Sequence, residues 1–458
     1  MKKIFFFLII FTSINIYAEE RDINTNITNI NEERNIDINE CINIALQNHS
    51  SLFILAEDNK QSIAQFRIAK SQKTLIIDGE LKTVEFVKSD SSANSNFQIP
   101  GKDTDIGLFA GLTMTYNLYD AKKDYTIEIA KTNIDISKLK TQKVRNDVIL
   151  EVKNAYYEYL LSKNALKIRE EINERYKKKS DLAKLLFEQG AKPILDVSKA
   201  EVDRADSELQ YEKAKNNERK TKLNLFYSMG LEESGSITIN PKDVETIPEL
   251  NYSIDDLYKM AELYSPAIRM TVLEKRTARL KISEENANHF PHVDILFGVG
   301  YQNETLYGLN KISENFNMNN WSPAFNGAIK AAIPIYSGGM IVAKVDSAES
   351  EYNKITYREK ELLVDTKNRI RDYCKSLEEI KKQIEISSLI TKNAQRHLLL
   401  AQRSYENGGV SLLELQDAEV SVINAEIGYL ESKYGYFLTL SKLSSLIGVG
   451  ENLLCKQE

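Results

Sequence analysis

The chain has 458 residues and carries 60 basic against 66 acidic side chains, which gives a formal net charge of −6 at pH 7. An acidic balance argues against a nucleic-acid partner, because binding to a phosphate backbone requires an excess of basic side chains. The cysteines (Cys41, Cys374 and Cys455) are odd in number and widely spaced, and the histidines form no metal-binding spacing, so the sequence predicts no disulfide framework, no metal and no cofactor.

Residues 1–18 predict a secretory signal peptide. Two lysines precede an apolar run at 4–11, and a small residue, Ala18, stands before the charged Glu19. A membrane anchor is the less favoured interpretation, because the run is much shorter than the roughly 20 apolar residues of a spanning helix. We therefore expect the mature chain to begin at Glu19, outside the cytoplasm.

The rest of the chain contains two similar halves. Residues 187–202 align without a gap on residues 405–420, and Gly190 falls opposite Gly408. The repeated unit is far longer than the roughly 20 to 50 residues of solenoid repeats, which indicates the duplication of one large unit. The expected division is repeat 1 at 19–230, an equatorial linker at 231–252, repeat 2 at 253–448 and a C-terminal tail at 449–458.

Each repeat is predicted to begin with a helix and a pair of strands. Helical apolar periodicity covers residues 38–73, and its copy covers residues 254–288. The strands are expected at about 74–88 and 105–119 in repeat 1, and at about 290–303 and 323–337 in repeat 2.

The strand at 105–119 alternates in the way that is typical of membrane barrels. Leu112 and Tyr116 fall on its apolar face and Thr113 on the other, while Phe109 is an exception on that second face. Strands of transmembrane barrels have about 9 to 11 residues and this two-residue period. A soluble sandwich strand would alternate too, but the signal peptide, the four such strands and the helices beside them favour the membrane.

Four strands cannot close a membrane barrel, and open sheet edges are not tolerated in hydrocarbon. Self-association is therefore required. A dimer would supply eight strands, whose barrel would be filled by its own side chains. Three chains forming a barrel of twelve strands is the simplest closed arrangement, so we predict a homotrimer in contact with lipid.

Each repeat is predicted to end in a long and a short helix joined by a hairpin turn. The long helices are expected at about 121–189 and 340–407, two stretches without proline or glycine, and the short ones at about 194–229 and 412–447. A long helix would span about 100 Å, which favours coiled-coil packing over a globular domain. The opening helix and the short helix together have about the length of the long helix. They are therefore expected to stack end to end beside it, with a belt at mid-height where they meet.

Taken in order, these features resemble those of TolC-type outer-membrane efflux proteins. The resemblance covers nearly everything after residue 18. It depends most on the predicted hairpin turns with Gly190 and Gly408, on the sequence motif at 405–414, and on the strand-to-helix turns at 116–120 and 333–339.

This resemblance implies a mixed fold class, all-α coiled coil plus membrane β. Its components would be a trimeric twelve-stranded β-barrel, a continuous twelve-helix periplasmic α-barrel and the internal two-fold sequence repeat. The implied function is that of a passive exit duct, not an enzyme, in a tripartite efflux pump or type I secretion system. Such a duct lies in the outer membrane with a large periplasmic portion, and it binds a periplasmic adaptor and, through it, an inner-membrane transporter.

The resemblance also implies roles for residues at the tips of the hairpins. Glu414 and Asp417 match acids that form rings at the periplasmic aperture, although ordinary solvated helix acids remain the alternative. The positions that match adaptor-docking tips are Gly190, Ala191, Gly408 and Gly409.

A second implied feature is a latch that keeps the aperture closed. Asp196 and Tyr405 match positions that link neighbouring coiled coils in the closed state, so a hydroxyl–carboxylate hydrogen bond is expected there. Val410, however, stands where better-known members carry an arginine, and Leu195 stands at the partner position of that arginine. That second polar contact is absent from this sequence, and an apolar contact is one possible replacement.

Two other classes of function are open at this point. A periplasmic coiled-coil scaffold or adaptor-like protein would explain the long helices but would leave the four alternating strands without a role. A secreted enzyme would need a polar catalytic constellation, which the sequence does not display.

Overall fold

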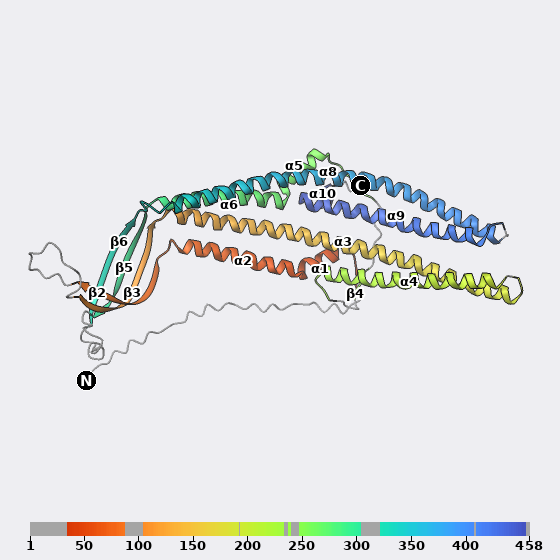
Figure 1. Ribbon diagram of the computed structural model, residues 1–458, viewed down its shortest axis with the longest axis horizontal. Coiled ribbons are helices and arrows are strands. Elements are labelled where there is room, and N and C mark those ends of the chain that lie inside the picture. Colours follow the sequence, from red (N-terminus) through yellow and green to blue (C-terminus); the bar gives the residue numbers. More distant parts are fainter. Residues whose placement is uncertain are drawn as a thin grey trace, which may run out of the picture.

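The structure is a computed structural model that describes residues 34–87, 104–191, 193–232, 237–239, 247–303, 321–406 and 409–454. The chain forms a long rod with four strands at one end and two helical hairpins at the other (Figure 1). The expected signal peptide and Gly408 lie outside the described residues.

The strands are β1 (Arg34–Ile36), β2 (Ile76–Val87), β3 (Thr104–Tyr119), β4 (Ile237–Ile239), β5 (His292–Asn303) and β6 (Trp321–Ala332). The helices are α1 (Ile38–Asn48), α2 (Ser50–Ser71), α3 (Ala121–Glu188), α4 (Ile194–Ser228), α5 (Ile254–Tyr264), α6 (Pro266–Asn286), the 3₁₀ helix η1 (Ala287–His289), α8 (Met340–Glu406), α9 (Leu412–Ile447) and α10 (Glu451–Leu454).

The two long helices form the shaft of the rod. α3 has 68 residues and α8 has 67, so each is about 100 Å long. α3 begins after Asp120, whose carboxylate accepts a hydrogen bond from the Lys122 backbone N–H at 3.0 Å. Each long helix packs against the short helix that follows it, which gives hairpin 1 (α3 and α4) and hairpin 2 (α8 and α9). Among the helices of the described ranges, none is both long and apolar enough to cross a lipid bilayer.

The opening helix of each repeat is broken, which corrects the expectation of single helices at 38–73 and 254–288. His49 separates α1 from α2 with extended dihedrals (φ −69°, ψ 121°). Ser265 separates α5 from α6 with similar values (φ −61°, ψ 118°). In repeat 2 the cause is local, because Pro266 disfavours helical backbone at the preceding residue and lacks the N–H that would continue the helix. Repeat 1 has no proline at this point, and its break coincides with a tertiary contact.

That contact is made by a glycine at the end of each short helix. Gly230 and Gly448 have φ angles of 72° and 84°, in the left-handed region. A Cβ atom on Gly230 would lie 2.8 Å from the Asn48 carbonyl oxygen, and one on Gly448 would lie 2.6 Å from the Tyr264 carbonyl oxygen. The end of each short helix therefore meets the break in the opening helix at mid-height.

Gly230→Ala is expected to destabilise the protein clearly more than Gly190→Ala. Both glycines have left-handed φ angles, 72° and 70°, so both substitutions carry the same backbone cost of about 1–2 kcal/mol. Only at Gly230 does the new methyl group also meet backbone atoms, since no described atom lies within 4 Å of that position at Gly190. Thermal unfolding of the two variants, followed by circular dichroism, measures the difference. Equal midpoints would show that the mid-height contact relaxes without cost.

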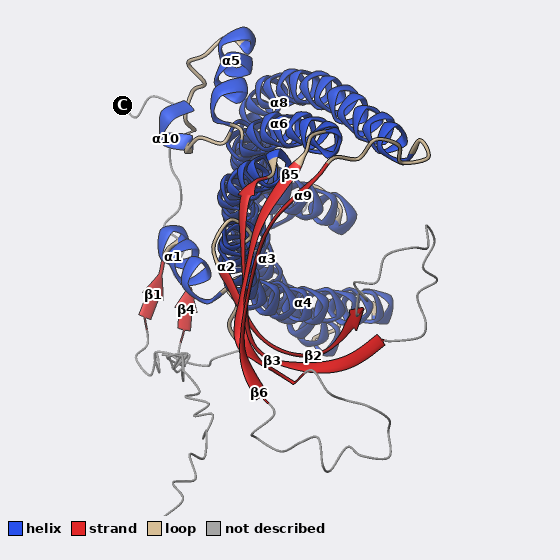
Figure 2. Ribbon diagram, turned by 90° about the vertical axis from the view of Figure 1, so that its left-hand side faces the viewer, coloured by secondary structure: helices blue, strands red, loops and turns tan. Residues whose placement is uncertain are grey.

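Four strands form one antiparallel sheet in the order β2-β3-β5-β6, and Figure 2 shows that this sheet is strongly curved. β6 ends at Ala332, which corrects the expected end at 337. Pro334 lacks a backbone N–H for pairing, and Gly338 and Gly339 then turn the chain with φ angles of 63° and 80°.

The sheet has an apolar face and a polar face. On the apolar face, Leu81, Phe325 and Ile329 leave between 71% and 74% of their surface exposed. On the polar face, Lys330 lies opposite Asp294, and the Asn117 amide donates a hydrogen bond to the Asp294 carboxylate at 2.7 Å. The register places these large side chains on the apolar face: Ile77, Leu81, Leu112, Tyr116, Ile295, Phe297, Val299, Tyr301, Phe325 and Ile329.

Phe109 breaks the alternation because it covers two glycines on the polar face. Its side chain is 3% exposed. A Cβ atom at Gly111 or Gly300 would lie 2.7 Å or 3.0 Å from the Phe109 Cζ atom, so the ring fits only where these side chains are missing. The Lys82 ammonium lies 5.3 Å from the ring centroid on the same strand pair. Glycine inside a strand here permits the close approach of an aromatic ring.

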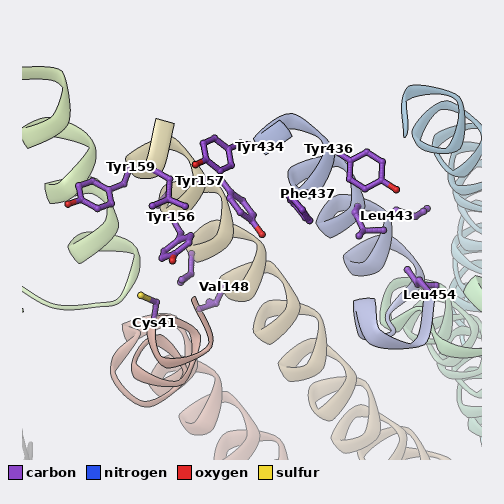
Figure 3. Close-up of a cluster of buried hydrophobic side chains, with 14 of the residues drawn as sticks. Cys41, Val148, Tyr156, Tyr157, Tyr159, Tyr434, Tyr436, Phe437, Leu443 and Leu454 are labelled. Carbon is purple, nitrogen blue, oxygen red and sulfur yellow. The ribbon is translucent and has the colours of Figure 1, made fainter. Parts of the chain in front are cut away.

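The core of the molecule lies at mid-height, where segments from the linker and the tail join the helices. β1 pairs in parallel with β4 beside α1 (Figure 2), and Leu454 of α10 is fully buried. Tyr157 of α3 stacks on Tyr434 and Phe437 of α9, with centroid distances of 5.9 Å and 5.8 Å (Figure 3). The Asn164 amide also donates to the Tyr434 hydroxyl at 2.9 Å. This aromatic contact fastens hairpin 1 to hairpin 2 at the belt.

Candidate functional site

The tip of hairpin 1 is a tight turn built on Gly190. Its left-handed φ of 70° ends α3, and the turn is closed by hydrogen bonds from the Gly190 N–H to the Phe187 carbonyl at 2.9 Å and from the Ala191 N–H to the Leu186 carbonyl at 2.8 Å. Pro193 then precedes α4. Gly190 and Ala191 are exposed, so this tip offers accessible backbone.

The tip of hairpin 2 has a related construction in its described part. The Gly409 N–H donates to the Ser404 carbonyl at 2.8 Å. A Cβ atom on Gly409 would lie 2.7 Å from the Ser404 hydroxyl oxygen, so the close approach favours glycine. Ser411 caps α9 by accepting a hydrogen bond from the Glu414 backbone N–H at 3.2 Å.

Glu414 and Asp417 lie in the first turns of α9, next to this tip. Their spacing places both carboxylates on one face of the helix, and both side chains are exposed. Leu415 and Ala418, in contrast, are buried between the helices of hairpin 2. The structure thus holds the two acids together on the outside of the hairpin, at the end of the rod that is opposite to the sheet.

The latch expected between Asp196 and Tyr405 stays a prediction. Asp196 is half-buried in the first turn of α4, and Tyr405 belongs to the last turn of α8, but its side chain lies outside the described part of the structure. Leu195 is 73% exposed, and Val410 is partly exposed.

Sequence reasoning missed a polar cluster that joins the two hairpins near the tips. The Gln416 amide of α9 donates a hydrogen bond to the Asp203 carboxylate of α4. The Glu419 carboxylate of α9 lies close enough to the Tyr176 hydroxyl of α3 to raise its pKa. The Lys179 ammonium lies 5.1 Å from the centroid of the Tyr176 ring. The cluster therefore contains contributions from three helices of both hairpins.

Burial shifts the pKa values of two members of the cluster, Tyr176 and Lys179. Burial raises the pKa of the Tyr176 hydroxyl, and the Glu419 and Asp203 carboxylates raise it further. Burial also lowers the pKa of the Lys179 ammonium, an effect that the same two carboxylates oppose. No local pattern marks these residues in the sequence, because their partners are distant in the chain. The spacing of Gln416 and Glu419 on one helix face is the only hint.

A cavity of about 310 Å³ lies between the hairpins beside this cluster, and Tyr176 and Glu419 of the cluster are among the residues that line it. Residues from α3, α8 and α9 line it, including the apolar Ile172, Leu398 and Val422 and the charged Arg175 and Glu426. The space between the hairpins is thus incompletely packed over part of its length.

The comparisons with known proteins agree with this architecture. The profile of a family described as outer membrane efflux protein matches residues 42–231 and 257–449. Outer membrane protein TolC of Escherichia coli (strain K12) is 21% identical over 355 residues, which cover 74% of this chain and 69% of that protein. TolC of Vibrio cholerae is 19% identical over 410 residues, which cover 89% of this chain and 90% of that protein.

Solved structures show the same fold. A crystal structure of CusC superposes with a TM-score of 0.74 at 18% identity, covering 90% of this chain and 92% of CusC. The CmeC outer membrane channel of Campylobacter jejuni superposes with a TM-score of 0.73 at 18% identity, covering 90% of this chain and 85% of CmeC. The family profile matches both repeats, and the sheet and the helical shaft have the expected arrangement. The chain therefore belongs to the outer membrane efflux protein family.

Proposed function

We propose that three copies of this chain form a channel-tunnel that serves as the passive exit duct of a tripartite efflux pump or a type I secretion system. The observation that carries this proposal is that the rod has an apolar sheet at one end and an exposed, acidic helical tip at the other. One end is a four-stranded sheet with a continuous apolar face. The other end presents the glycine turn at Gly190, the exposed Gly409 and a pair of exposed acids.

The sheet supports the trimer. Within the described strands, β2 and β6 each pair on one side only, and an unpaired edge cannot remain in hydrocarbon. Joining β6 of one chain to β2 of the next would close both edges. Three chains would supply twelve strands, with the apolar faces toward lipid and the polar faces, which carry Asp294 and Lys330, toward a water-filled lumen.

The tips support docking of a periplasmic adaptor. Gly190 and Ala191 expose backbone in a turn with open space around it, and Gly409 marks the corresponding end of hairpin 2. A partner helix hairpin could approach the Gly190 turn closely, because no described atom lies within 4 Å of a Cβ atom placed there. The adaptor would then connect the duct to an inner-membrane transporter.

The acids support a selective aperture. In a trimer, hairpin 2 would bring three copies of Glu414 and Asp417 around one axis. Rings of carboxylates attract cations and repel anions, and their mutual repulsion would favour opening. The Asp196–Tyr405 hydrogen bond is our proposed restraint against that opening.

A periplasmic scaffold is not favoured. It would expose the apolar face of the sheet to water, where Leu81, Phe325 and Ile329 would each be largely solvated. Contiguous apolar patches of this kind mark contact with lipid or with another protein.

The proposal is tested by measuring the oligomer mass and the single-channel conductance of the same detergent-extracted sample in planar bilayers. A trimer that passes a small, cation-selective current is the expected result. A monomeric protein without current, recovered from the soluble periplasmic fraction, would contradict the duct and favour the scaffold.

A further inference from the structure

Each free edge of the four-stranded sheet carries a charged side chain on the polar face. Asp78 belongs to the edge strand β2 and lies opposite Thr113 of β3. Lys330 belongs to the other edge strand, β6, and lies opposite Asp294 of β5. The two edges that would meet between neighbouring chains of a barrel therefore carry opposite charges on the same face.

Neither charge is compensated within the single chain. Both side chains are exposed, and within the described ranges neither of them forms an ion pair or a hydrogen bond. The next acid of the same face on β2, Glu80, is already paired with Lys82 at 3.0 Å. Asp294 already accepts a hydrogen bond from an amide group at 2.7 Å. Asp78 and Lys330 are thus the two edge charges that remain available to another chain.

The two residues also lie at the same height on the sheet. Asp78 is the third residue of β2, which begins at Ile76, and Lys330 is the third residue from the end of β6 at Ala332. Each is therefore about 7 Å from the helical end of its strand. An antiparallel contact that places Ile76 of one chain opposite Ala332 of the next also places Asp78 opposite Lys330.

The slope of the sheet supports this register. Across the sheet the ladders join Ile76 to Thr115, Thr115 to Leu296, and Leu296 to Ala328. β6 then continues for four residues beyond this line, to Ala332. A displacement of four residues per chain amounts to about twelve residues in a barrel of three chains, which corresponds to a strand tilt of about 35°. Strands of transmembrane barrels tilt by about 35–45°, so this register closes a barrel of ordinary geometry.

We propose that Asp78 of one chain and Lys330 of the next form an ion pair at each of the three chain boundaries, and that this pair fixes the register in which the barrel closes. This inference depends on the proposed trimeric duct. A slip of one residue between the edges would turn the apolar face into the lumen, so the apolar pattern excludes it. A slip of two residues keeps both faces, and only the charges oppose it.

The consequences of a two-residue slip differ with its direction. In one direction Lys330 would lie opposite Ile76, and the ion pair would be lost. In the other direction it would lie opposite Glu80, which Lys82 already holds, and Asp78 would be left without a partner. Cross-strand pairs of opposite charge stabilise a sheet, so the register with Asp78 opposite Lys330 is favoured over both alternatives.

Cysteine crosslinking of the detergent-extracted mature protein tests the register. Residues directly opposite each other in an antiparallel ladder have Cα atoms about 4.5 to 5.5 Å apart, which a disulfide can bridge. Mild oxidation of the variant that combines Asp78→Cys with Lys330→Cys is expected to convert most chains into a covalent trimer on a non-reducing gel. The two single-cysteine variants reveal any pairing with the native cysteines.

The matched control combines Asp78→Cys with Ala324→Cys, on the same face of the same two strands. Ala324 is six residues from Lys330, a distance of about 20 Å along the strand, so no covalent trimer is expected. A third pair, Glu80→Cys with Lys330→Cys, reports the slipped register. A trimer by mass that crosslinks through Glu80 or Ala324 in preference to Asp78, or through none of them, would overturn the ion pair and leave the duct intact. A protein that forms no trimer would overturn the duct, and the ion pair with it.

Charge variants test whether the pair stabilises the trimer. Asp78→Asn and Lys330→Gln are each expected to lower the temperature at which the trimer dissociates in detergent by several degrees. The double variant is expected to lower it no further than either single variant, because the same interaction is lost in all three. Asp294→Asn is the control, since Asp294 lies opposite Lys330 in the same chain, and it should leave this temperature nearly unchanged. A loss with Asp294→Asn and none with Asp78→Asn would show that Lys330 serves its own chain, which would overturn the proposal.

Discussion

Ile329→Arg is expected to abolish assembly of the protein in the outer membrane. Ile329 lies on the apolar face of β6 opposite Ile295 and is 74% exposed in the single chain. In the proposed barrel it faces lipid, where an arginine near the bilayer midplane costs about 2–4 kcal/mol. The trimer would bear this cost three times. Quantifying the trimer in isolated outer membranes measures the effect, and little or none should be found.

The neighbouring position supplies the control. Ala328 is exposed and lies on the opposite, polar face of the same strand, opposite Leu296. Ala328→Arg adds the same charge and bulk at the same depth, but toward the proposed lumen, so the trimer should assemble in nearly normal amount. Equal assembly of the two variants would contradict the assignment of the apolar face to lipid.

Replacing both Glu414 and Asp417 by alanine is expected to reduce the cation preference of the channel several-fold. The double variant removes six carboxylates from the aperture of the proposed trimer, and block by divalent cations should weaken with it, because carboxylate rings concentrate cations at a constriction. The reversal potential across a salt gradient measures selectivity, and titration of a divalent cation measures block.

The matched variant removes two acids from hairpin 1 instead. Asp181 and Glu188 are exposed on α3 at the same end of the rod, and their replacement by alanine changes the net charge equally. We expect this second variant to retain the normal selectivity. If both double variants behave like the unmodified channel, Glu414 and Asp417 do not line the constriction.

Much of the architecture follows from local patterns. The absence of proline and glycine over 121–189 predicts a helix, and α3 extends from Ala121 to Glu188. The two-residue alternation around Leu112 predicts a strand with one apolar face, and the register of β3 with β5 has that face. Both patterns reflect the preference of each residue for a backbone conformation and for a degree of solvent exposure. They can therefore be interpreted without knowing which distant residues each one contacts.

Local patterns gave a wrong prediction, or none, where a contact with a distant segment determines the structure. The break at His49 has no proline to announce it, and it occurs where Gly230 approaches the Asn48 carbonyl. Phe109 is an exception to the alternation, and its position is explained only by Gly111 and Gly300, one of which comes from the other repeat.

The sequence by itself predicted the repeated unit, and it determined the two hairpins, the turn at Gly190 and the sidedness of the strands, because periodicity and backbone preference are properties of neighbouring residues. The tertiary structure alone decided how the two repeats meet. The approach of Tyr176 to Glu419 and the hydrogen bond of Gln416 with Asp203 join residues more than 200 positions apart, and the stack of Tyr157 on Tyr434 and Phe437 joins the same two repeats at the belt. These pairings depend on the relative placement of helices that pack along their whole length, and no local preference encodes that placement.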